Sequence, residues 1–380
     1  MLLWNDPSST VAARFGIAGD FLPASGLQPV GTQTWSEMAG PLVEAFGGLD
    51  FALVNLESPV DVGSLPPRTK PSLGDTFGAP KEALDYLHAL KCKVVSLANN
   101  HTYDYDSSGV ARTEAALKAA GIVALGISQN LEESPSVYVL NLGDTARVGI
   151  WCSALALREC ATKKSAGLEP ATLERGKAAL SLLKSQGATC CVAFLHAGAE
   201  GTNRPDPGAV KLMDFLAHDG FDLVAACHSH RTSGFADIAR RSSPYPAFCF
   251  YGLGSISSGV IYSDWERQGI LALIGLNSEG RIASVEARPI YLADRGRGTI
   301  PTREQEESIL GGFLAVSREI LDGSYEHEFY SDAGRHFLQA QWRDLTLAFN
   351  RAGMRGVLAK VARLRMGHLR TLFHSNLRSG

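Results

Sequence analysis

The sequence lacks the features that attach a chain to a membrane or mark it for an oxidising compartment. No window of its 380 residues approaches the roughly 20 consecutive apolar residues of a spanning helix, and its first residues have neither a basic start nor an apolar stretch of signal-peptide length. The seven cysteines form no CxxC pair, and several lie inside apolar runs. We therefore expect a cytoplasmic protein with reduced, buried thiols; for one of them the alternative is a nucleophilic Cys227 beside His228.

The sequence also lacks an excess of charge of one sign. Its 36 Lys and Arg against 39 Asp and Glu give a formal charge of -3 and a pI near 6.4, which excludes a general attraction to nucleic acid. Residues 351–380 are an exception, because they contain seven Arg and Lys and no acid, with apolar residues at helical spacing. We expect a helix docked on the body with its basic face in solvent; an acidic partner or a membrane surface is the alternative.

Short apolar runs alternate with segments in which apolar residues have helical spacing, and this alternation predicts a layered α/β fold. Several runs are apolar on both faces, which is typical of central strands covered by helices on each side. The predicted strands are residues 13–19, 51–56, 93–98, 122–126, 147–154, 190–195, 222–227 and 247–253. The predicted helices are residues 80–91, 108–120, 172–187 and 207–219.

The composition changes near residue 300. Residues 269–292 are predicted to form an antiparallel hairpin around the turn "NSEG", and residues 303–374 have the pattern of helices only. We therefore divide the chain into an α/β domain, residues 1–300, and a C-terminal helical region, residues 301–380.

Polar side chains follow several predicted strands at their carboxyl ends, where open α/β sheets bind their ligands. They are Asp20, Asn55, Glu57, Asn99, Asn100, His101, His196, Glu200, His228 and His230. Each has a structural explanation when taken alone: Asp20 as a helix cap, Asn100 in a turn, Glu57 paired with Arg68. Buried together without partners, however, such groups cost about 1 to 3 kcal/mol each, and a shared cation would satisfy them jointly.

The types of ligand constrain the cation. Imidazole nitrogens with carboxylate and amide oxygens favour Mn, Fe, Zn, Co or Ni over calcium. Three histidines, two acids and an amide exceed the three or four protein ligands of one catalytic ion, so we expect two divalent ions bridged by a carboxylate. In an extended segment side chains alternate, so His228 and His230 would share a side and one would reach each ion.

The order of these motifs resembles the calcineurin-like metallophosphoesterase superfamily, and within it the CapA branch of poly-γ-glutamate capsule-synthesis proteins. The resemblance rests on "GDFLP" (19–23), "VNLESPV" (54–60), residues 96–126 beginning "SLANNHTYD", "LHAGAE" (195–200), "CHSH" (227–230) and "FYGLGSI" (250–256). It implies the layered metallophosphatase sandwich of that superfamily over about residues 14–290, followed by a helical extension.

The resemblance also implies roles for individual residues. Glu57 would bridge two ions, at a position where many relatives have Asp. The implied ligands are Asp20 and His230 for the first ion and Asn100, His196 and His228 for the second.

The catalytic histidine of the superfamily falls at His101, and Asp104 would orient it. The chain departs from the pattern at Leu22, where many phosphoesterases have a histidine, so the first ion would be bound weakly or completed by water. The usual glycine before the HxH is Ala226, a mild change.

Such a site is compatible with more than one reaction. A bound cation lowers the pKa of water from 15.7 to about 7, which serves hydrolysis of an amide or a phosphoester. The same cation can polarise a carbonyl so that His101 removes the neighbouring Cα proton, and the outcome is then epimerisation. Phosphoester chemistry usually needs cationic clamps, and little basic sequence adjoins the motifs. We expect Arg231, Arg68 and Glu200 to contact the substrate.

The CapA resemblance favours a peptide, amide or poly-γ-glutamate-like substrate. The lack of an export signal supports an alternative, a cytosolic epimerase that inverts a residue in a ribosomal (lasso) precursor peptide; a phosphoesterase is a further alternative. A non-catalytic accessory module is also compatible with the sequence. In that case the metal site is vestigial and the C-terminal helices recruit a partner.

Overall fold

The computed structural model describes residues 1–332 except 25, 69–75, 144–145, 201, 241–242 and 262, and beyond them residues 342, 345–346 and 353–355. The predicted basic helix at 351–380 therefore lies outside the described residues, apart from 353–355. Among the described helices, none combines the length and the apolar character that crossing a membrane requires.

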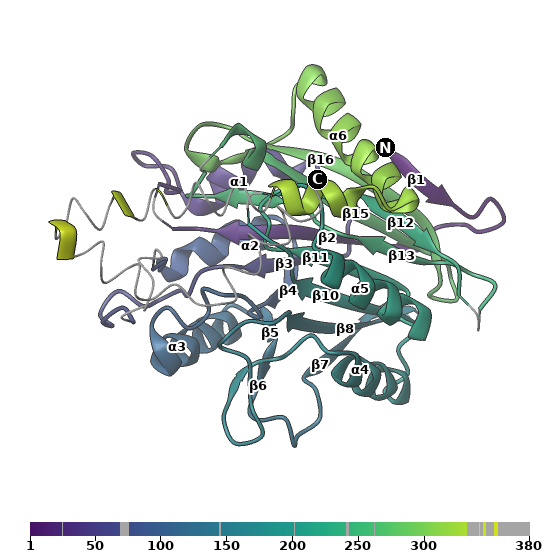
Figure 1. Ribbon diagram of the computed structural model, residues 1–380, viewed down its shortest axis with the longest axis horizontal. Helices are drawn as coiled ribbons and strands as arrows, with labels where there is room; N and C mark the ends of the chain where they lie inside the picture. Colours follow the sequence, from purple (N-terminus) through teal and green to yellow (C-terminus); the bar gives the residue numbers. More distant parts are fainter. Residues whose placement is uncertain are drawn as a thin grey trace.

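The first sheet is nine-stranded. Seven of its strands follow the order β1-β16-β15-β2-β3-β4-β5 (Figure 1). The other two, β14 and β17, pair with β2 and β16. Its strands are β1 (Leu2–Asn5), β2 (Ala13–Leu22), β3 (Phe51–Leu56), β4 (Cys92–Ser96), β5 (Val123–Leu125), β14 (Ser255–Ser258), β15 (Gln268–Leu276), β16 (Ile282–Leu292) and β17 (Gly298–Thr299). Strands β2 to β5 are parallel, and β15 and β16 form the predicted antiparallel hairpin beside β2.

The second sheet has the order β12-β13-β11-β10-β8-β7, and its central strands β8, β10, β11 and β13 are parallel. Its strands are β7 (Val137–Leu142), β8 (Ala146–Ala154), β10 (Cys190–His196), β11 (Leu223–Cys227), β12 (Phe235–Ile238) and β13 (Ala247–Phe250). A small third sheet pairs β6 (Ile127–Ser128) with β9 (Gly167–Leu168).

Several helices follow a residue whose side chain accepts a hydrogen bond from a free backbone N–H group of the first turn. The helices are α1 (Trp35–Val43), α2 (Leu84–Ala89) after a 3-10 turn at Lys81–Ala83, α3 (Asp106–Ala119), α4 (Leu173–Ser185), α5 (Pro207–Asp219) and α6 (Arg303–Asp322). Thr34 and Thr302 form capping boxes at α1 and α6, and Asp206 caps α5 directly before Pro207.

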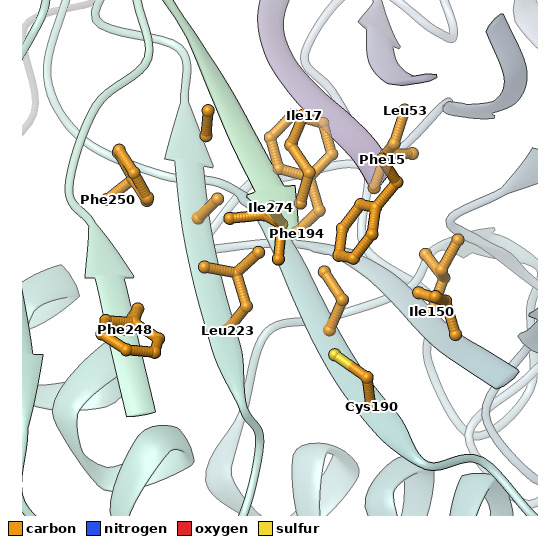
Figure 2. Close-up of a cluster of buried hydrophobic side chains, with 14 of the residues drawn as sticks. Phe15, Ile17, Leu53, Ile150, Cys190, Phe194, Leu223, Phe248, Phe250 and Ile274 are labelled. Carbon is orange, nitrogen blue, oxygen red and sulfur yellow. The ribbon is translucent and has the colours of Figure 1, made fainter. Parts of the chain in front are cut away.

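The main core lies between the two sheets. Figure 2 shows Phe15, Ile17 and Leu53 of the first sheet packed towards Ile150, Phe194 and Leu223 of the second. The outer face of the first sheet is covered by α1, α2 and α3, and that of the second by α4 and α5. The layered α/β prediction is therefore confirmed.

The expectation that helices cover both faces of the central strands was wrong. Each sheet has helices on one face and the other sheet on its opposite face, so its strands are apolar on both faces for a different reason. The sequence pattern reports that both faces are buried, but it does not report what covers them.

All eight predicted strands and four helices are present, with ends shifted by a few residues. Helix α1 was not predicted, because Gly40 and Pro41 interrupt its helical pattern. The predicted C-terminal helices begin with α6, whose Phe313 ring lies 6.3 Å from Phe250 of the second sheet. The division near residue 300 stays a prediction.

Candidate metal centre

The candidate ligands lie where the carboxyl ends of the two sheets meet. Asp20 of β2 lies beside Asn55 of β3 in parallel register, and His196 of β10 lies beside Cys227 of β11. Strands β2 and β11 contact each other across the sheet interface. The structure thus gathers all six predicted metal ligands: Asp20, Glu57, Asn100, His196, His228 and His230.

Asp20 is fully buried and engaged on both oxygens. Its Oδ1 accepts a hydrogen bond from Asn55 Nδ2 at 2.8 Å, and its Oδ2 accepts one from the backbone N–H of His228 at 3.2 Å. The same Oδ2 lies 3.2 Å from His230 Nδ1. Burial by itself raises the pKa of Asp20, but the hydrogen bond and the charge of His230 outweigh it and lower the pKa below the ordinary 3.8. Asp20 is therefore a carboxylate at neutral pH.

Gly19 lets a neighbouring strand approach Asp20. A Cβ at Gly19 would collide with the carbonyl oxygen of Gly254, which accepts a hydrogen bond from the Asp20 N–H at 2.9 Å. Strand β14 then runs parallel to β2, and its Ser255 hydroxyl lies 3.4 Å from His230 Nδ1. The "GD" and "FYGLGSI" stretches are thus parts of one site.

Glu57 lies at the centre of the cluster, directly after β3. Its Oε1 lies 3.6 Å from His196 Nε2, and its Oε2 lies 3.7 Å from His230 Nδ1. Neither buried oxygen accepts a hydrogen bond from any described residue. Burial, and after it the charge of Asp20, raise the pKa of Glu57 well above the ordinary 4.5. A carboxylate in this situation is costly unless a cation compensates it.

His196 and His228 face each other, with ring centroids 4.3 Å apart. His196 Nε2 lies 2.8 Å from Asn100 Oδ1, and His228 Nδ1 is buried without a hydrogen-bond partner in the described part of the chain. Burial lowers the pKa of both histidines, and the charge of His228 lowers that of His196 further. Both rings are therefore neutral, which is the form that binds a metal ion.

The expectation of an extended segment at His228 and His230 was wrong. Strand β11 ends at Cys227, and the backbone then turns with φ of 114° at His228 and 57° at His230. Positive φ is uncommon for a residue with a side chain, although histidine adopts it more often than most. The turn still sends the two rings to different places, His228 towards His196 and His230 towards Asp20.

His230 differs from the other two histidines in charge. Burial by itself lowers its pKa, but the charge of Glu57 and then the hydrogen bond with Asp20 raise it to about 10. Without a metal ion, the imidazolium of His230 thus pairs with the Asp20 carboxylate at 3.2 Å and lies 3.7 Å from Glu57 Oε2. A bound divalent ion would compete with that proton for the same nitrogen and oxygens.

The geometry fits a divalent cation. Three overlapping groups have ligand atoms within 4.8 Å of one another: Asp20 with His196 and Cys227, Glu57 with His196 and His228, and Asp20 with Glu57 and His230. Nitrogen and carboxylate donors in such groups suit borderline first-row metals. Glu57 belongs to two of the groups, as a bridging ligand must.

His101 and Asp104 form the predicted pair at the rim of the cluster. His101 Nδ1 lies 2.9 Å from Asp104 Oδ2, and the His101 ring packs 4.4 Å from the ring of Phe77, measured between centroids. The same Asp104 oxygen accepts the backbone N–H of Phe77 at 2.8 Å. Asp104 therefore fixes the orientation of the imidazole.

Two asparagines support the cluster from beneath and were not assigned a role from the sequence. Asn55 bridges Asp20 and Asn99, because its Nδ2 donates to Asp20 and its Oδ1 accepts from Asn99 Nδ2 at 3.1 Å. Asn99 in turn accepts the backbone N–H of His101 at 3.1 Å. The sequence indicates only that these asparagines lie at the ends of adjacent parallel strands. Whether such a residue binds a metal ion or supports a ligand depends on the direction of its side chain.

The three predicted substrate residues lie in different surroundings. Arg231 directly follows His230, donates to Ser263 Oγ at 3.2 Å, and has a buried Nε without a partner among the described residues. Glu200 is exposed, and its charge acts on Glu57, His228 and His230.

Arg68 is engaged away from the cluster. Its guanidinium pairs with Glu159 at 3.3 Å and with Asp106 at 3.5 Å, so it is not the partner of Glu57. Its backbone N–H donates to the carbonyl oxygen of Asp104 at 2.8 Å.

Cys227 does not have the surroundings of a nucleophile. Its side chain is buried, its Sγ lies 3.6 Å from His196 Nδ1, and burial together with the charge of Asp20 raises the pKa of its thiol well above 9.0. A reactive cysteine needs the opposite shift and an exposed sulfur.

Comparison with known proteins places the chain in a family. Residues 14–259 match the family described as "Bacterial capsule synthesis protein PGA_cap". The chain belongs to this family. The resemblance to CapA proteins is thereby confirmed. The capsule biosynthesis protein CapA of Bacillus anthracis is 25% identical to it over 230 residues, which are 59% of this chain and 54% of CapA. The PGA_cap chain thus spans about half the length of this curated relative.

Solved structures of similar arrangement include two enzymes of Thermus thermophilus. The 5'-nucleotidase precursor of this bacterium aligns with 82% of this chain and 59% of its own, with a TM-score of 0.47 and 14% identity. The sulfate thiohydrolase SoxB aligns with 83% of this chain and 62% of its own, with a TM-score of 0.42 and 13% identity.

Proposed function

We propose that this PGA_cap protein is a metal-dependent enzyme that hydrolyses an amide bond in a peptide or poly-γ-glutamate-like substrate at a centre of two divalent ions. The observation that carries the proposal is Glu57, a buried carboxylate without a hydrogen bond from the described residues, placed between His196 and His230. A buried structural carboxylate is normally hydrogen-bonded, whereas a carboxylate that bridges two ions needs a free lone pair on each oxygen.

The ligand assignment follows the distances. Asp20 and His230 would hold one ion, Asn100, His196 and His228 the other, and Glu57 would bridge them. Bound there, divalent cations supply a water of lowered pKa and polarise a carbonyl group. The ion that this site prefers is Mn, Fe, Zn, Co or Ni according to its donor set.

His101 is the proton carrier of the proposal. Asp104 bonded to Nδ1 selects the tautomer with its proton on that nitrogen, so Nε2 of the neutral ring accepts a proton. In amide hydrolysis His101 Nε2 would take a proton from the water whose oxygen adds to the carbonyl carbon. As the C–N bond breaks, His101 would give that proton to the leaving nitrogen. The packing of Phe77 on the ring keeps it in one orientation for both transfers.

An acidic substrate is supported by Arg231. Its guanidinium lies directly after the ligand His230 and keeps a buried Nε without a described partner. A substrate carboxylate would satisfy this donor, as the side chains of a glutamate polymer provide. The name of the CapA relative, a capsule biosynthesis protein, agrees with such a polymer.

The test is incubation of the Mn²⁺-loaded protein with γ-linked glutamate oligomers and α-linked control peptides in deuterated water. We expect two fragments from the γ-linked oligomer. One deuterium at a Cα without cleavage would instead establish the epimerase alternative. His101→Ala should abolish turnover while the metal content stays near that of the wild type; loss of metal in this variant would show that His101 is a ligand.

A further inference from the structure

A second cavity lies at the opposite end of the second sheet from the candidate metal centre. Its volume is about 250 Å³, and it is lined where strands begin, by Cys191 near the start of β10, Asp222 directly before β11 and Pro246 directly before β13. The metal ligand His196 is the last residue of β10. With a rise of about 3.3 Å per residue it lies about 17 Å from Cys191, so the cavity is a separate site.

Arg240 is a cation built into the lining of this cavity, with a side chain that is only 9% exposed. Its Nε donates to the carbonyl oxygen of Tyr245 at 2.9 Å, Nη1 to Asp222 Oδ1 at 2.8 Å and Nη2 to Ser243 Oγ at 3.4 Å. The other Asp222 oxygen accepts the backbone N–H of Cys191 at 2.7 Å, so this carboxylate is held in place to orient the guanidinium. A guanidinium has five N–H donors, and the described residues accept from three of them, which leaves two donors for a ligand.

The lining of the cavity carries an excess of positive charge. Lys184, Arg240 and Arg281 line it, and Asp222 is the one acid among the described lining residues. Lys184 Nζ has neither a hydrogen bond nor an ion pair within the part of the chain that the structure describes, and a Cβ at Gly220 would lie 3.1 Å from it. Because Asp222 is already engaged by Arg240, the remaining positive charge favours an anion in the cavity.

Aromatic side chains form another part of the lining. The ring of Trp4 packs on that of Phe248 with centroids 5.0 Å apart; Phe248 is buried, whereas Trp4 is only half-buried and keeps surface for a ligand. The Arg281 guanidinium lies 5.0 Å from the centroid of the Tyr245 ring and also pairs with the exposed Glu279. The cavity thus combines aromatic surface with cations, which suits a ligand that has a flat apolar part and a negative group.

We propose that this cavity binds a small aromatic anion, whose ring packs on Trp4 and whose oxyanion group accepts hydrogen bonds from Arg240 and Lys184. A phosphate and a carboxylate present the same chemistry to these donors. At about 250 Å³ the cavity is below the roughly 300 to 1,000 Å³ of pockets for drug-sized ligands, so its ligand is a molecule with a single ring. The site makes no use of the metal ions and goes beyond the proposed function.

The test is isothermal titration calorimetry of the whole chain in the presence of a chelator. The probes are phenyl phosphate and benzoate, with inorganic phosphate and acetate as the matching anions without a ring. We expect phenyl phosphate or benzoate to bind at one site, about tenfold or more tightly than its ring-free counterpart, and the tighter of the two identifies the anionic group. Lys184→Gln should weaken this binding by about three- to tenfold, and Trp4→Leu should remove the advantage of the ring.

Lys177→Gln is the matched control, since Lys177 lies on the same helix α4, pairs with Asp219 and does not line the cavity. It should bind the probes like the wild type; an equal loss in both lysine variants would show a general effect of surface charge and overturn the proposal. No binding of either ring-bearing probe at millimolar concentration, or binding unchanged by Lys184→Gln and Trp4→Leu, would also overturn it. Because the titration contains a chelator and measures no turnover, these results leave the proposed metal-dependent hydrolysis unaffected.

Discussion

Without metal, the Glu57→Gln variant should be more stable than the wild type. With metal bound, the wild type should be the more stable of the two. In the metal-free protein both Glu57 oxygens are buried without a hydrogen bond from the described residues, and burial and Asp20 raise its pKa despite the attraction of His230. An unsatisfied buried group costs about 1 to 3 kcal/mol. The neutral amide removes the ionic part of this cost, so Glu57→Gln should unfold at higher urea concentration than the wild type in the presence of a chelator.

Metal should favour the wild type. A ligand at 100 times its Kd stabilises the protein that binds it by about 2.7 kcal/mol, which is enough to offset the advantage of the variant. The assay is urea unfolding of both proteins with chelator and with Mn²⁺, together with metal content by mass spectrometry, and the exposed Glu82→Gln is the control. The reasoning is refuted if the variant is less stable than the wild type without metal, or if Mn²⁺ stabilises both equally.

Three further predictions concern other parts of the chain. Glu169 forms a buried bidentate pair with Arg175, at 2.7 Å and 2.8 Å, so Glu169→Ala should cost about 3 to 5 kcal/mol in urea unfolding, whereas a loss below 1 kcal/mol would mean that the pair is solvated. Six of the seven cysteines are buried, so a thiol reagent should label Cys160 first. The Cys160→Ser variant should lack this fast phase of labelling, and fast labelling of Cys227 would contradict its burial. Burial raises the pKa of Asp214 above the ordinary 3.8. Between pH 3.8 and the raised pKa the native state binds more protons than the unfolded chain, so the free energy of unfolding falls as the pH rises. Asp214→Asn should flatten this fall, and an unchanged pH profile would argue against the reasoning.

The strand ends could be predicted from the sequence because of a rule about parallel strands. Asp20, Glu57 and His196 each follow an apolar run, and parallel strands bring their carboxyl ends to one edge. The sequence could not show whether a helix or the other sheet covers each face of a strand, because Val, Ile and Leu pack equally well on both. The order of sheets therefore required the structure, although the gathering of ligands did not.

Within the site, the direction of the side chains could not be predicted from the sequence. His228 and His230 were expected to alternate as in a strand, but the chain had already left β11 and turned through positive φ at both positions. Histidine is enriched at positive φ, but such residues remain uncommon, so "CHSH" alone does not distinguish that turn from an extended segment. Asn55 likewise sits next to Asp20 in register, and only its bonds to Asp20 and Asn99 show that it supports the site.

The turn at His228 and His230 and the buried carboxylates are two separate energetic costs within the same ligand cluster. Holding His228 and His230 at positive φ costs of order 1 to 3 kcal/mol each, and the bond from the His228 N–H to Asp20 Oδ2 opposes that cost. Asp20 therefore does two things at once: one oxygen fixes the backbone that presents the histidines, and the same oxygen faces the ring of His230. A fold selected for stability alone would relax the turn and replace Glu57 with an apolar residue. The proposed function explains why both costs occur in one place, because ligands that are already in position bind a cation without reorganisation.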